Sequence, residues 1–490
     1  VLGTLWWRAG RRASNAVLGL PVAGLALAFH KDMQIYATGG LETMAFTLAL
    51  LWAVLVTAGP QKRWDLAAAL YAIATLLRPE GALYTSAALM FILWSSRSLR
   101  TVLRFAIVWA LLVGPSEVFR LAYFGEWLPN TYYAKSGGTS NWHQGWIYTS
   151  LYFSIYAVQL LALPAFIVVA VKALRNRIDS PQGPVRSQLA LLVSSHILLS
   201  LLYVTRLGGD FMFARFYIPI TPLLFLLVED AVVLTRRRSL EVIALVFMLG
   251  GVLYARELHG QRLPGRERIE GIVNEYKFYP PDYIEVVRRQ GEVLGRALRG
   301  TTAGVGLLSG QDAMAYFGNL RYALEPHGLT DHVLARKPIA ERGRPGHERT
   351  ASLEDLLLRS VHFRMRYGLT VGLAIERQIR FEELYGEIVF YDRAIMDQMR
   401  GRPGVIFLEY PDLLRKTIQD LQVSQGRLVD DYRQAHLFYF IHNDDEALLR
   451  EYRAALLKQG IPIEALNEVD QKAADFRRRM QQENLRTGRR

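Results

Sequence analysis

Long apolar runs fill the first half of the chain and do not continue into the second. Up to about residue 256, hydrophobic residues come in runs of roughly 15 to 25, the length with which a helix crosses about 30 Å of hydrocarbon. After residue 256 they occur in short pieces among Arg, Glu and Asp. We therefore expect an α-helical multi-span membrane domain over residues 1–256 and a soluble α/β or α+β domain over residues 257–490.

The apolar runs of the first half predict nine membrane spans, whose connections lie alternately on the two sides of the membrane. The expected spans are 15–31, 41–58, 64–79, 81–96, 101–122, 147–172, 186–207, 216–235 and 239–256. Basic clusters mark every second connection: Arg8, Arg11 and Arg12; Lys62 and Arg63; Arg97, Arg100 and Arg104; Lys172, Arg175, Arg177 and Arg186; Arg236, Arg237 and Arg238. Because Lys and Arg keep short loops in the cytoplasm, the other connections and everything after Arg256 are expected outside. The formal net charge of +13 then reports topology, and we expect no nucleic-acid partner.

Charged residues also stand beside the spans at the connections that are expected outside. They are Glu42, Arg78, Glu80, Arg120, Lys135, Asp210 and Arg215. A charged side chain costs roughly 2.5 to 3.5 kcal/mol at the centre of a spanning helix, so such residues indicate a functional site by default. For each one alone, the alternative is a loop or interface residue whose charged end reaches water. Because they all fall on one face, we favour a shared cavity.

The residue types of this cavity suit a polyprenyl-phosphate sugar. We expect Arg78, Lys135 and Arg215 to bind the donor phosphate, because Arg binds phosphate oxygens in a planar fork and Lys supplies a mobile charge. Glycosyl transfer also needs a carboxylate that takes the proton of the acceptor hydroxyl, and Glu42 or Asp210 could assist in this. The residues expected beside the sugar are Glu80, Asn130, Tyr132 and Tyr133.

The soluble half shows a mixed pattern of elements. Apolar positions in 282–299 share one helical face, and 303–310 predicts a short strand that ends in a Gly-rich turn before a helix at Asp312. The glycines of this turn lack the spacing of a nucleotide-binding loop, which favours an ordinary tight turn. Further elements expected are a strand at 404–412, helices over most of 352–400 and 411–480, and a frayed Arg-rich helix at 477–490.

Several motifs together resemble a known family. They are Gly40-Leu-Glu-Thr43, Leu77-Arg-Pro-Glu-Gly81, the segments 127–135 and 208–219, Gly328-Leu-Thr-Asp331 and the segment 342–348. Over about residues 15 to 365, their spacing is similar to that of the actinobacterial terminal β-(1→2) arabinofuranosyltransferases and their relatives, which belong to the GT-C superfamily of membrane glycosyltransferases. The two motifs of the soluble half are more specific than those of the membrane half.

The resemblance implies an inverting glycosyltransferase of a bacterial inner (plasma) membrane, with an extracytoplasmic C-terminal domain. Its donor would be a polyprenyl-phosphate sugar such as decaprenyl-phospho-arabinose, and its acceptor a cell-envelope glycan that Asp331 and His347 contact. No cofactor beyond the lipid-linked donor is expected, and a metal requirement stays open. GT-C enzymes usually carry the catalytic aspartate between their first two spans. The resemblance therefore implies that the chain is a fragment whose principal base lies before Val1.

Two other classes of protein stay open on the sequence alone. A transporter or flippase of lipid-linked saccharides also carries charges within the membrane, but many secondary transporters consist of repeated halves, and we detect no internal repeat in this sequence. A noncatalytic scaffold for envelope assembly is the other alternative. Transfer of a radiolabelled sugar separates the three, because a transporter would move the lipid without consuming it.

Overall fold

The computed structural model describes residues 1–10, 18–135, 139–174, 183–265, 269–308, 312–366, 373–421 and 425–487 of the 490-residue chain. They form a helical unit (Val1–Tyr132, Gly138–Tyr279 and Gly343–Pro345) and a sheet unit (Tyr133–Gly137, Pro280–Arg342 and Gly346–Arg490). The domain boundary expected at residue 256 lies inside helix α13, Arg238–Arg262. Of the predicted features, Arg11, Arg12, Arg175, Arg177, Gly310 and residues 488–490 lie outside the described residues.

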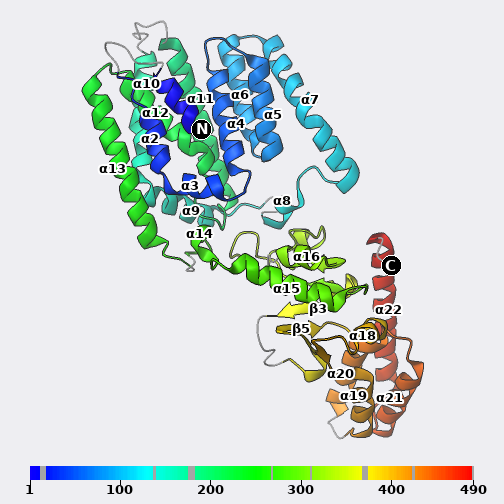
Figure 1. Cartoon of the computed structure of the whole chain (residues 1–490). Helices are drawn as coiled ribbons and strands as arrows, with labels where there is room; N and C mark the ends of the chain where they lie inside the picture. The colour runs from blue at the N-terminus through cyan, green and yellow to red at the C-terminus, as the bar shows by residue number, and fades with distance from the viewer. Residues whose placement is uncertain are drawn as a thin grey trace. The chain divides into compact units, whose positions relative to one another are not determined.

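Helices make up nearly all of the helical unit (Figure 1). They are α1 Leu2–Gly10, α2 Val22–Phe29, α3 Lys31–Thr38, α4 Thr43–Thr57, α5 Trp64–Leu77, α6 Gly81–Ser96, α7 Leu99–Phe124, α8 Asn130–Lys135, α9 Trp142–Ile155, η1 Ala157–Leu161, α10 Ala162–Leu174, α11 Gly183–Leu207, η2 Ile218–Ile220, α12 Thr221–Val233, α13 and α14 Glu275–Phe278, with α8 crossing into the sheet unit. Each predicted span overlaps at least one of these helices.

Fewer helices than predicted spans are long enough to cross a membrane. Among the described residues, Leu99–Phe124, Gln188–Leu207 and Arg238–Arg262 have the required length and hydropathy. Two bent pairs raise the number to five if each pair is one span: α3 with α4, bent by 114°, and α9 with Ala157–Val171, bent by 92°. Helices α5 and α6 have 14 and 16 residues, short of the about 20 that a straight span needs. The structure confirms a helical region with three to five candidate spans, and nine stays a prediction.

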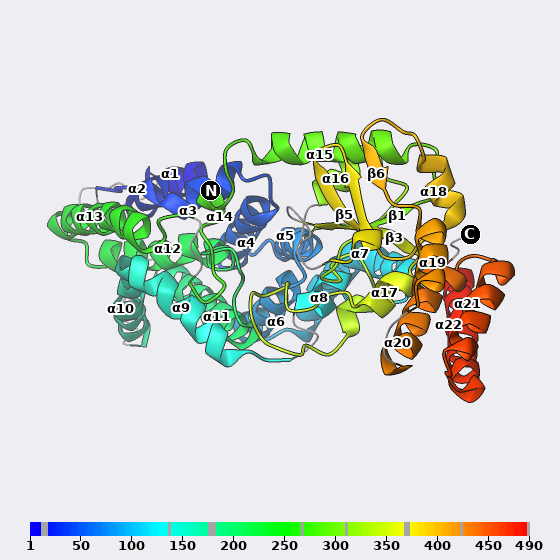
Figure 2. The same cartoon turned by 90° about the horizontal axis from the view of Figure 1, so that it is seen from below.

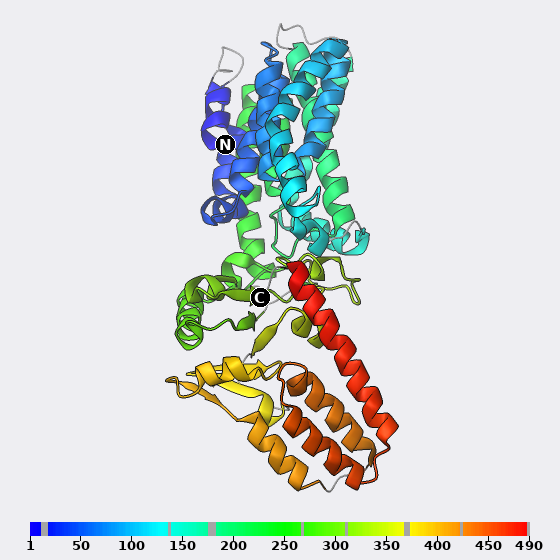
Figure 3. The ribbon, with the colours of Figure 1, turned by 90° about the vertical axis from the view of Figure 1, so that its right-hand side faces the viewer.

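The helical unit has a buried centre and an apolar outer surface. Almost every residue of α12 is buried, and this helix packs against α2, α10 and α11. Helices α4, α5 and α6 lie side by side, with α7 along α5 (Figures 1 and 3). On α7 the side chains of Leu111 and Val118 are 70% and 69% exposed. An apolar surface of this extent on a helix is typical of contact with lipid.

The sheet unit contains a mixed six-stranded sheet in the order β2-β1-β3-β5-β4-β6. The strands are β1 Gly304–Gly306, β2 Tyr322–Leu324, β3 Val361–Arg366, β4 Gln378–Phe381, β5 Leu384–Ile388 and β6 Val405–Phe407. Strand β1 runs parallel to β2 and β3, and the remaining pairs are antiparallel. This confirms the expected α/β character of the second half.

Helices surround this sheet and share hydrophobic core clusters with it (Figures 2 and 3). They are α15 Tyr283–Leu298, α16 Asp312–Gly318, α17 Leu353–Leu358, α18 Arg393–Met399, α19 Tyr410–Gln419, α20 Gln425–Ala435, α21 Glu446–Lys458 and α22 Ile463–Thr487, with short turns η3 Leu334–Arg336, η4 Ile375–Arg377 and η5 His436–Phe440. Phe363 and Met365 of β3 contribute to the shared core with Leu294 of α15. The predicted helix over 282–299 is confirmed.

The sequence pattern predicts helices over most of 352–400, and this is wrong for residues 361–366, 378–381 and 384–388, which form three strands. In β3 the side chains of Phe363 and Met365 are buried, whereas Arg364 and Arg366 on the other face are half-buried. Such two-residue alternation is short here, and the strand is stabilised by pairing with β1, more than fifty residues away in sequence. The predicted strand at 404–412 is shorter than expected, because β6 ends at Phe407 and α19 begins at Tyr410.

Candidate functional site

Five charged residues of the helical unit form one connected group, the arginine–carboxylate cluster: Glu42, Arg78, Glu80, Asp210 and Arg215. Oε1 of Glu42 lies 3.0 Å from Nη2 of Arg215 and 3.7 Å from Nη1 of Arg78. Nε of Arg78 lies 2.5 Å from Oε1 of Glu80, and Nη1 of Arg215 lies 3.3 Å from Oδ2 of Asp210. The sequence predicted that these residues share one face, and the structure brings them into contact.

Breaks in the helices position these side chains. Glu42 precedes α4 after Gly40, whose φ of +68° favours glycine, and Arg78 stands in an extended conformation at the end of α5. Asp210 follows Gly209, where φ is +71° and a Cβ atom would come within 2.3 Å of the ring of Tyr148. Each of these residues therefore comes from a segment that the sequence bends out of a helix, which places its side chain at a helix end.

The cluster retains hydrogen-bonding capacity. Asp210 is 1% exposed and Arg78 is 5% exposed. Nevertheless Nη1 of Arg78, Nε of Arg215 and Oγ1 of Thr43 are buried without a hydrogen-bond partner among the described residues. Buried polar groups are almost always hydrogen-bonded, so unsatisfied donors beside one another need a physical explanation, such as a bound group.

Glu275 and Arg344 extend the charged region of the helical unit, and the sequence pattern did not single out Glu275. The guanidinium of Arg344 lies 4.2 Å from the ring centre of Phe211 and 5.5 Å from that of Phe278. Oε2 of Glu275 and Nε of Arg344 are buried without a hydrogen-bond partner in the part of the chain that the structure describes. Burial raises the pKa of Glu275, while the positive charge of Arg344 acts to lower it. A carboxylate in this state is suited to accept a proton.

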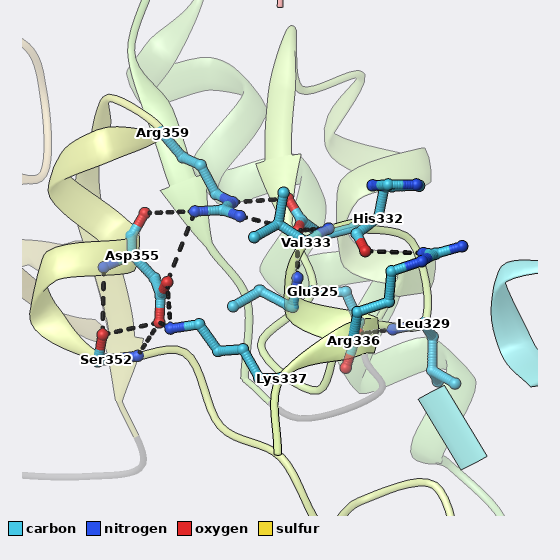
Figure 4. Close-up of polar contacts among 11 residues, drawn as sticks. Glu325, Leu329, His332, Val333, Arg336, Lys337, Ser352, Asp355 and Arg359 are labelled. Atoms are coloured by element: carbon cyan, nitrogen blue, oxygen red, sulfur yellow. Dashed lines mark hydrogen bonds and ion pairs between the residues drawn. The ribbon is translucent and has the colours of Figure 1, made fainter. Parts of the chain in front are cut away.

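Asp331 lies in the sheet unit, within an ion-pair network that also includes Arg359, Asp355 and Lys337. Figure 4 shows Arg359, Asp355 and Lys337 with their polar contacts. Oδ2 of Asp331 accepts a hydrogen bond from Nε of Arg359 at 2.6 Å, and Oδ1 accepts one from Nη2 at 2.9 Å. The backbone N–H groups of Val333 and Leu334 also donate to Oδ1. These contacts are those of a residue that shapes its own loop. A contact with the acceptor stays a prediction.

The other soluble-half motif is also held by local contacts. The rings of His347 and His327 lie 4.9 Å apart, and His327 shares a hydrogen bond of 2.7 Å with the carbonyl oxygen of Arg349. Arg349 is 8% exposed and donates to the carbonyl oxygens of Lys337 and Ala134. The segment between the two motifs is thus connected to its neighbours at several points.

The remaining predicted site residues divide between the units. Asn130 and Tyr132 are half-buried in the helical unit, whereas Tyr133 and Lys135 belong to the sheet unit. The guanidinium of Arg336 lies 3.9 Å from the ring centre of Tyr133. Of the three cations expected at the donor phosphate, Arg78 and Arg215 therefore meet at one carboxylate within the helical unit, and the role of Lys135 stays a prediction.

A second buried polar network in the helical unit was not foreseen. Oδ2 of Asp32 accepts a hydrogen bond of 2.6 Å from the hydroxyl of Tyr156, and Oδ1 lies 3.4 Å from Nε2 of His259. The ring of His30 stacks on that of Tyr156 with centres 3.9 Å apart. These residues are far apart in sequence, so no local pattern could reveal the network. No group of three or more possible metal-binding residues was found in the described ranges.

The candidate spanning helices indicate an integral membrane protein with a buried charged cluster, and an α/β region follows them. By sequence the chain is a distant homologue of terminal beta-(1->2)-arabinofuranosyltransferases. It is 28% identical over 251 residues to the one from Mycobacterium tuberculosis (strain ATCC 25618 / H37Rv), a match that covers 46% of this chain and 39% of the relative. For the relative from Corynebacterium glutamicum the identity is 26% over 329 residues, 58% of this chain and 47% of the relative.

The matched part thus spans less than half the length of either relative. No protein-family model matches the chain, and no solved structure matches it significantly.

Proposed function

We propose that the protein is an inverting membrane glycosyltransferase of the GT-C type, which moves arabinofuranose from a polyprenyl-phosphate donor such as decaprenyl-phospho-arabinose to a cell-envelope glycan. The observation that carries this proposal is the meeting of Arg78 and Arg215 at Glu42, in the helical unit of a chain homologous to arabinofuranosyltransferases. The protein would lie in a bacterial inner membrane, with the sheet unit outside the cytoplasm and the lipid tail of the donor in the bilayer.

In this reaction the bond between the anomeric carbon and the donor phosphate breaks, and its electron pair leaves with the polyprenyl phosphate. The acceptor hydroxyl forms the new bond and gives up its proton. The unsatisfied N–H groups of Arg78 and Arg215 would donate to the phosphate oxygens as negative charge develops there. A buried donor without a partner costs about 1 to 3 kcal/mol, so binding a phosphate would also relieve an existing cost.

Among the described carboxylates, Glu275 is the best suited to assist proton transfer. Glu42 and Asp210 each hold an oxygen against Arg215, so both carboxylates are already engaged in ion pairs. Glu275 keeps one buried oxygen unpaired, and burial raises its pKa toward neutrality. We therefore assign the assisting role to Glu275, with Glu42 and Asp210 orienting Arg215.

The experiment is a transfer assay with the purified protein in detergent. Decaprenyl-phospho-arabinose with a radiolabelled sugar and a synthetic arabinan acceptor are the substrates, and labelled glycan is the product. Arg215→Gln should lower transfer by at least about 100-fold, as expected when a preorganised donor to developing charge is removed. Arg104→Gln is the matched control, because the side chain of Arg104 is 70% exposed in an isolated pair with Asp65.

Movement of labelled lipid across vesicles without formation of labelled glycan would contradict the proposal in favour of a transporter. Loss of activity in Arg104→Gln equal to that in Arg215→Gln would show that the assay reports general damage. Glu275→Gln should lower kcat with little change in donor affinity, because its effect concerns proton transfer.

A further inference from the structure

The sheet unit contains a polar cavity of about 510 Å³ that the proposed transfer does not use. This is within the range of about 300 to 1,000 Å³ that ligand pockets span. It lies where the parallel strands β1, β2 and β3 begin, because its lining includes Thr302, Tyr322 and His362. Helix α22 contributes another wall through Arg477, Gln481 and Asn484. All of these residues belong to the sheet unit.

The cavity lining includes a histidine whose ring can accept a hydrogen bond. The side chain of His442 is hydrogen-bonded to the backbone of Leu437, and its Nε2 is buried without a partner among the described residues. Burial lowers the pKa of His442 to about 3. The ring is therefore neutral at pH 7, and with the other nitrogen donating to the backbone, Nε2 presents a lone pair. A buried acceptor of this kind requires a donor such as a hydroxyl group.

His362 and Asp392 add a second, fixed pair. Nδ1 of His362 accepts a hydrogen bond of 2.9 Å from the backbone N–H of Gly304, so Nε2 carries the proton and faces Oδ2 of Asp392 at 3.5 Å. Burial acts to raise the pKa of Asp392, but His362 and backbone donors outweigh it and hold the pKa below its ordinary value. Asp392 is therefore a carboxylate at neutral pH, able to accept further hydrogen bonds.

Cationic groups line the cavity as well. Arg359 is neutralised by Asp331, and Arg477 forms an exposed ion pair with Asp444. Arg321, by contrast, makes no ion pair with any carboxylate in the part of the chain that the structure describes. The cavity thus combines the positive charge of Arg321 with the carboxylate of Asp392 and the lone pair of His442, both of which can accept hydrogen bonds from hydroxyl groups.

We propose that this cavity binds a saccharide that carries a phosphate or a carboxylate, with Arg321 at the anionic group and His442 and Asp392 at sugar hydroxyls. A neutral sugar would leave Arg321 unpaired, and a bare anion would leave the acceptors of His442 and Asp392 unused. The site is separate from the arginine–carboxylate cluster and goes beyond the proposed transfer. It gives the sheet unit a binding function of its own.

The test is titration calorimetry on the purified full chain in detergent. The probes are ribose 5-phosphate and glucuronate, compared with ribose and with inorganic phosphate. The wild-type protein should bind one or both anionic saccharides saturably, with each control probe at least about tenfold weaker, as expected for a charge-assisted contact. Arg321→Gln should weaken this binding by about tenfold. Gln481→Trp, at an exposed position of α22, should block the cavity without removing a charge.

Arg380→Gln is the matched control, because Arg380 is exposed on β4 and does not line the cavity. No saturable binding of either anionic saccharide would overturn the proposal. Equal affinity for inorganic phosphate would overturn the assignment of a saccharide, and equal affinity for ribose would overturn the role of Arg321. The variant Glu42→Gln, which should lose sugar transfer, should bind these probes like the wild type. The two functions can therefore fail independently.

Discussion

Replacing Asp331 by asparagine should destabilise the sheet unit by about 3 kcal/mol. The change keeps the shape of the side chain but removes the negative charge that faces Arg359, whose side chain is 4% exposed. It also places an NH₂ group or a neutral oxygen where two guanidinium N–H groups now donate at 2.6 and 2.9 Å. The Nη1 group of Arg359 would keep its hydrogen bond of 3.3 Å to the carbonyl oxygen of Asp355 and its contact of 3.7 Å with Oδ1 of Asp355, but the two hydrogen bonds to a charged carboxylate would be lost.

The magnitude follows from burial. Removing one partner of a buried ion pair costs about 3 to 5 kcal/mol, because the remaining charge stays uncompensated. The lower end applies here, since Asp355 remains and the side chain of Asp331 is itself 11% exposed. The control is Glu382→Gln, which breaks the pair of Glu382 with Arg296. These side chains are 43% and 54% exposed, so the expected loss is below about 1 kcal/mol.

The chain allows the two units to be followed separately in one denaturation experiment. All nine tryptophans precede residue 147 and belong to the helical unit, and the chain has no cysteine. A fluorophore on the variant Tyr316→Cys, at a position 81% exposed in the sheet unit, would report that unit alone. With a urea slope of about 2 kcal/mol/M, the midpoint of the fluorophore signal should fall by about 1.5 M. The tryptophan midpoint should not move.

A shift no larger than that of Glu382→Gln would refute the structural role of Asp331. If the acceptor KM rose at the same time, Asp331 would instead contact the acceptor, as the sequence motif suggested. Restoration of stability in Asp331→Asn by a second change of Arg359 to Met would support the reasoning, because the pair then loses both charges.

The sheet unit should also lose stability in acid. Burial acts to raise the pKa of Asp331, but hydrogen bonds from Arg359 outweigh it and lower the pKa. The stability that this carboxylate contributes is therefore present above about pH 4 and lost as pH falls through the native pKa. The urea midpoints of wild type and Asp331→Asn should converge between pH 7 and pH 3. Gly145→Ala should destabilise the helical unit, because the new Cβ would lie 1.8 Å from a backbone oxygen of α11. Gly114→Ala should not, because no atom lies within 4 Å of the position of its Cβ. The unfolding midpoints from tryptophan fluorescence compare the two variants. An impermeant maleimide should label Tyr316→Cys in spheroplasts but reach Arg100→Cys only after permeabilisation, and the reverse order would refute the predicted topology.

The sequence predicts the helical unit well because its signal is local. An apolar run long enough for a helix needs no distant partner, so each predicted span overlaps a helix. Breaks in these helices are also visible locally, at Gly40, Pro79 and Gly209, and this is why Glu42, Arg78 and Asp210 could be grouped before the fold was known. The number of true spans is harder to predict, because bends such as that between α9 and α10 depend on packing.

The parts that escaped prediction depend on distant contacts. Strands β3, β4 and β5 are short, and β3 pairs with β1, more than fifty residues earlier in the sequence, so a local pattern does not identify them. Glu275 and Arg344 are separated by about seventy residues, and only the folded chain places Arg344 over Phe211. The cavity beside His442 is assembled from separate segments of the sheet unit and has no motif.

The two buried ion-pair groups differ in how completely the guanidinium groups of their arginines are hydrogen-bonded, and this difference separates a candidate ligand site from a purely structural network. Every guanidinium nitrogen of Arg359 donates a hydrogen bond, to Asp331 or to the backbone of Asp355, so this network satisfies the charge it buries. The arginine–carboxylate cluster does not, because Nη1 of Arg78 and Nε of Arg215 are buried without a hydrogen-bond partner among the described residues. Burying an ion costs several kcal/mol, and a pair that only joined helices could be replaced by apolar residues at little or no loss of stability. A ligand with anionic oxygens would satisfy both arginines at once. We therefore expect sugar transfer to depend on Arg78 and Arg215, and the stability of the sheet unit to depend on Arg359.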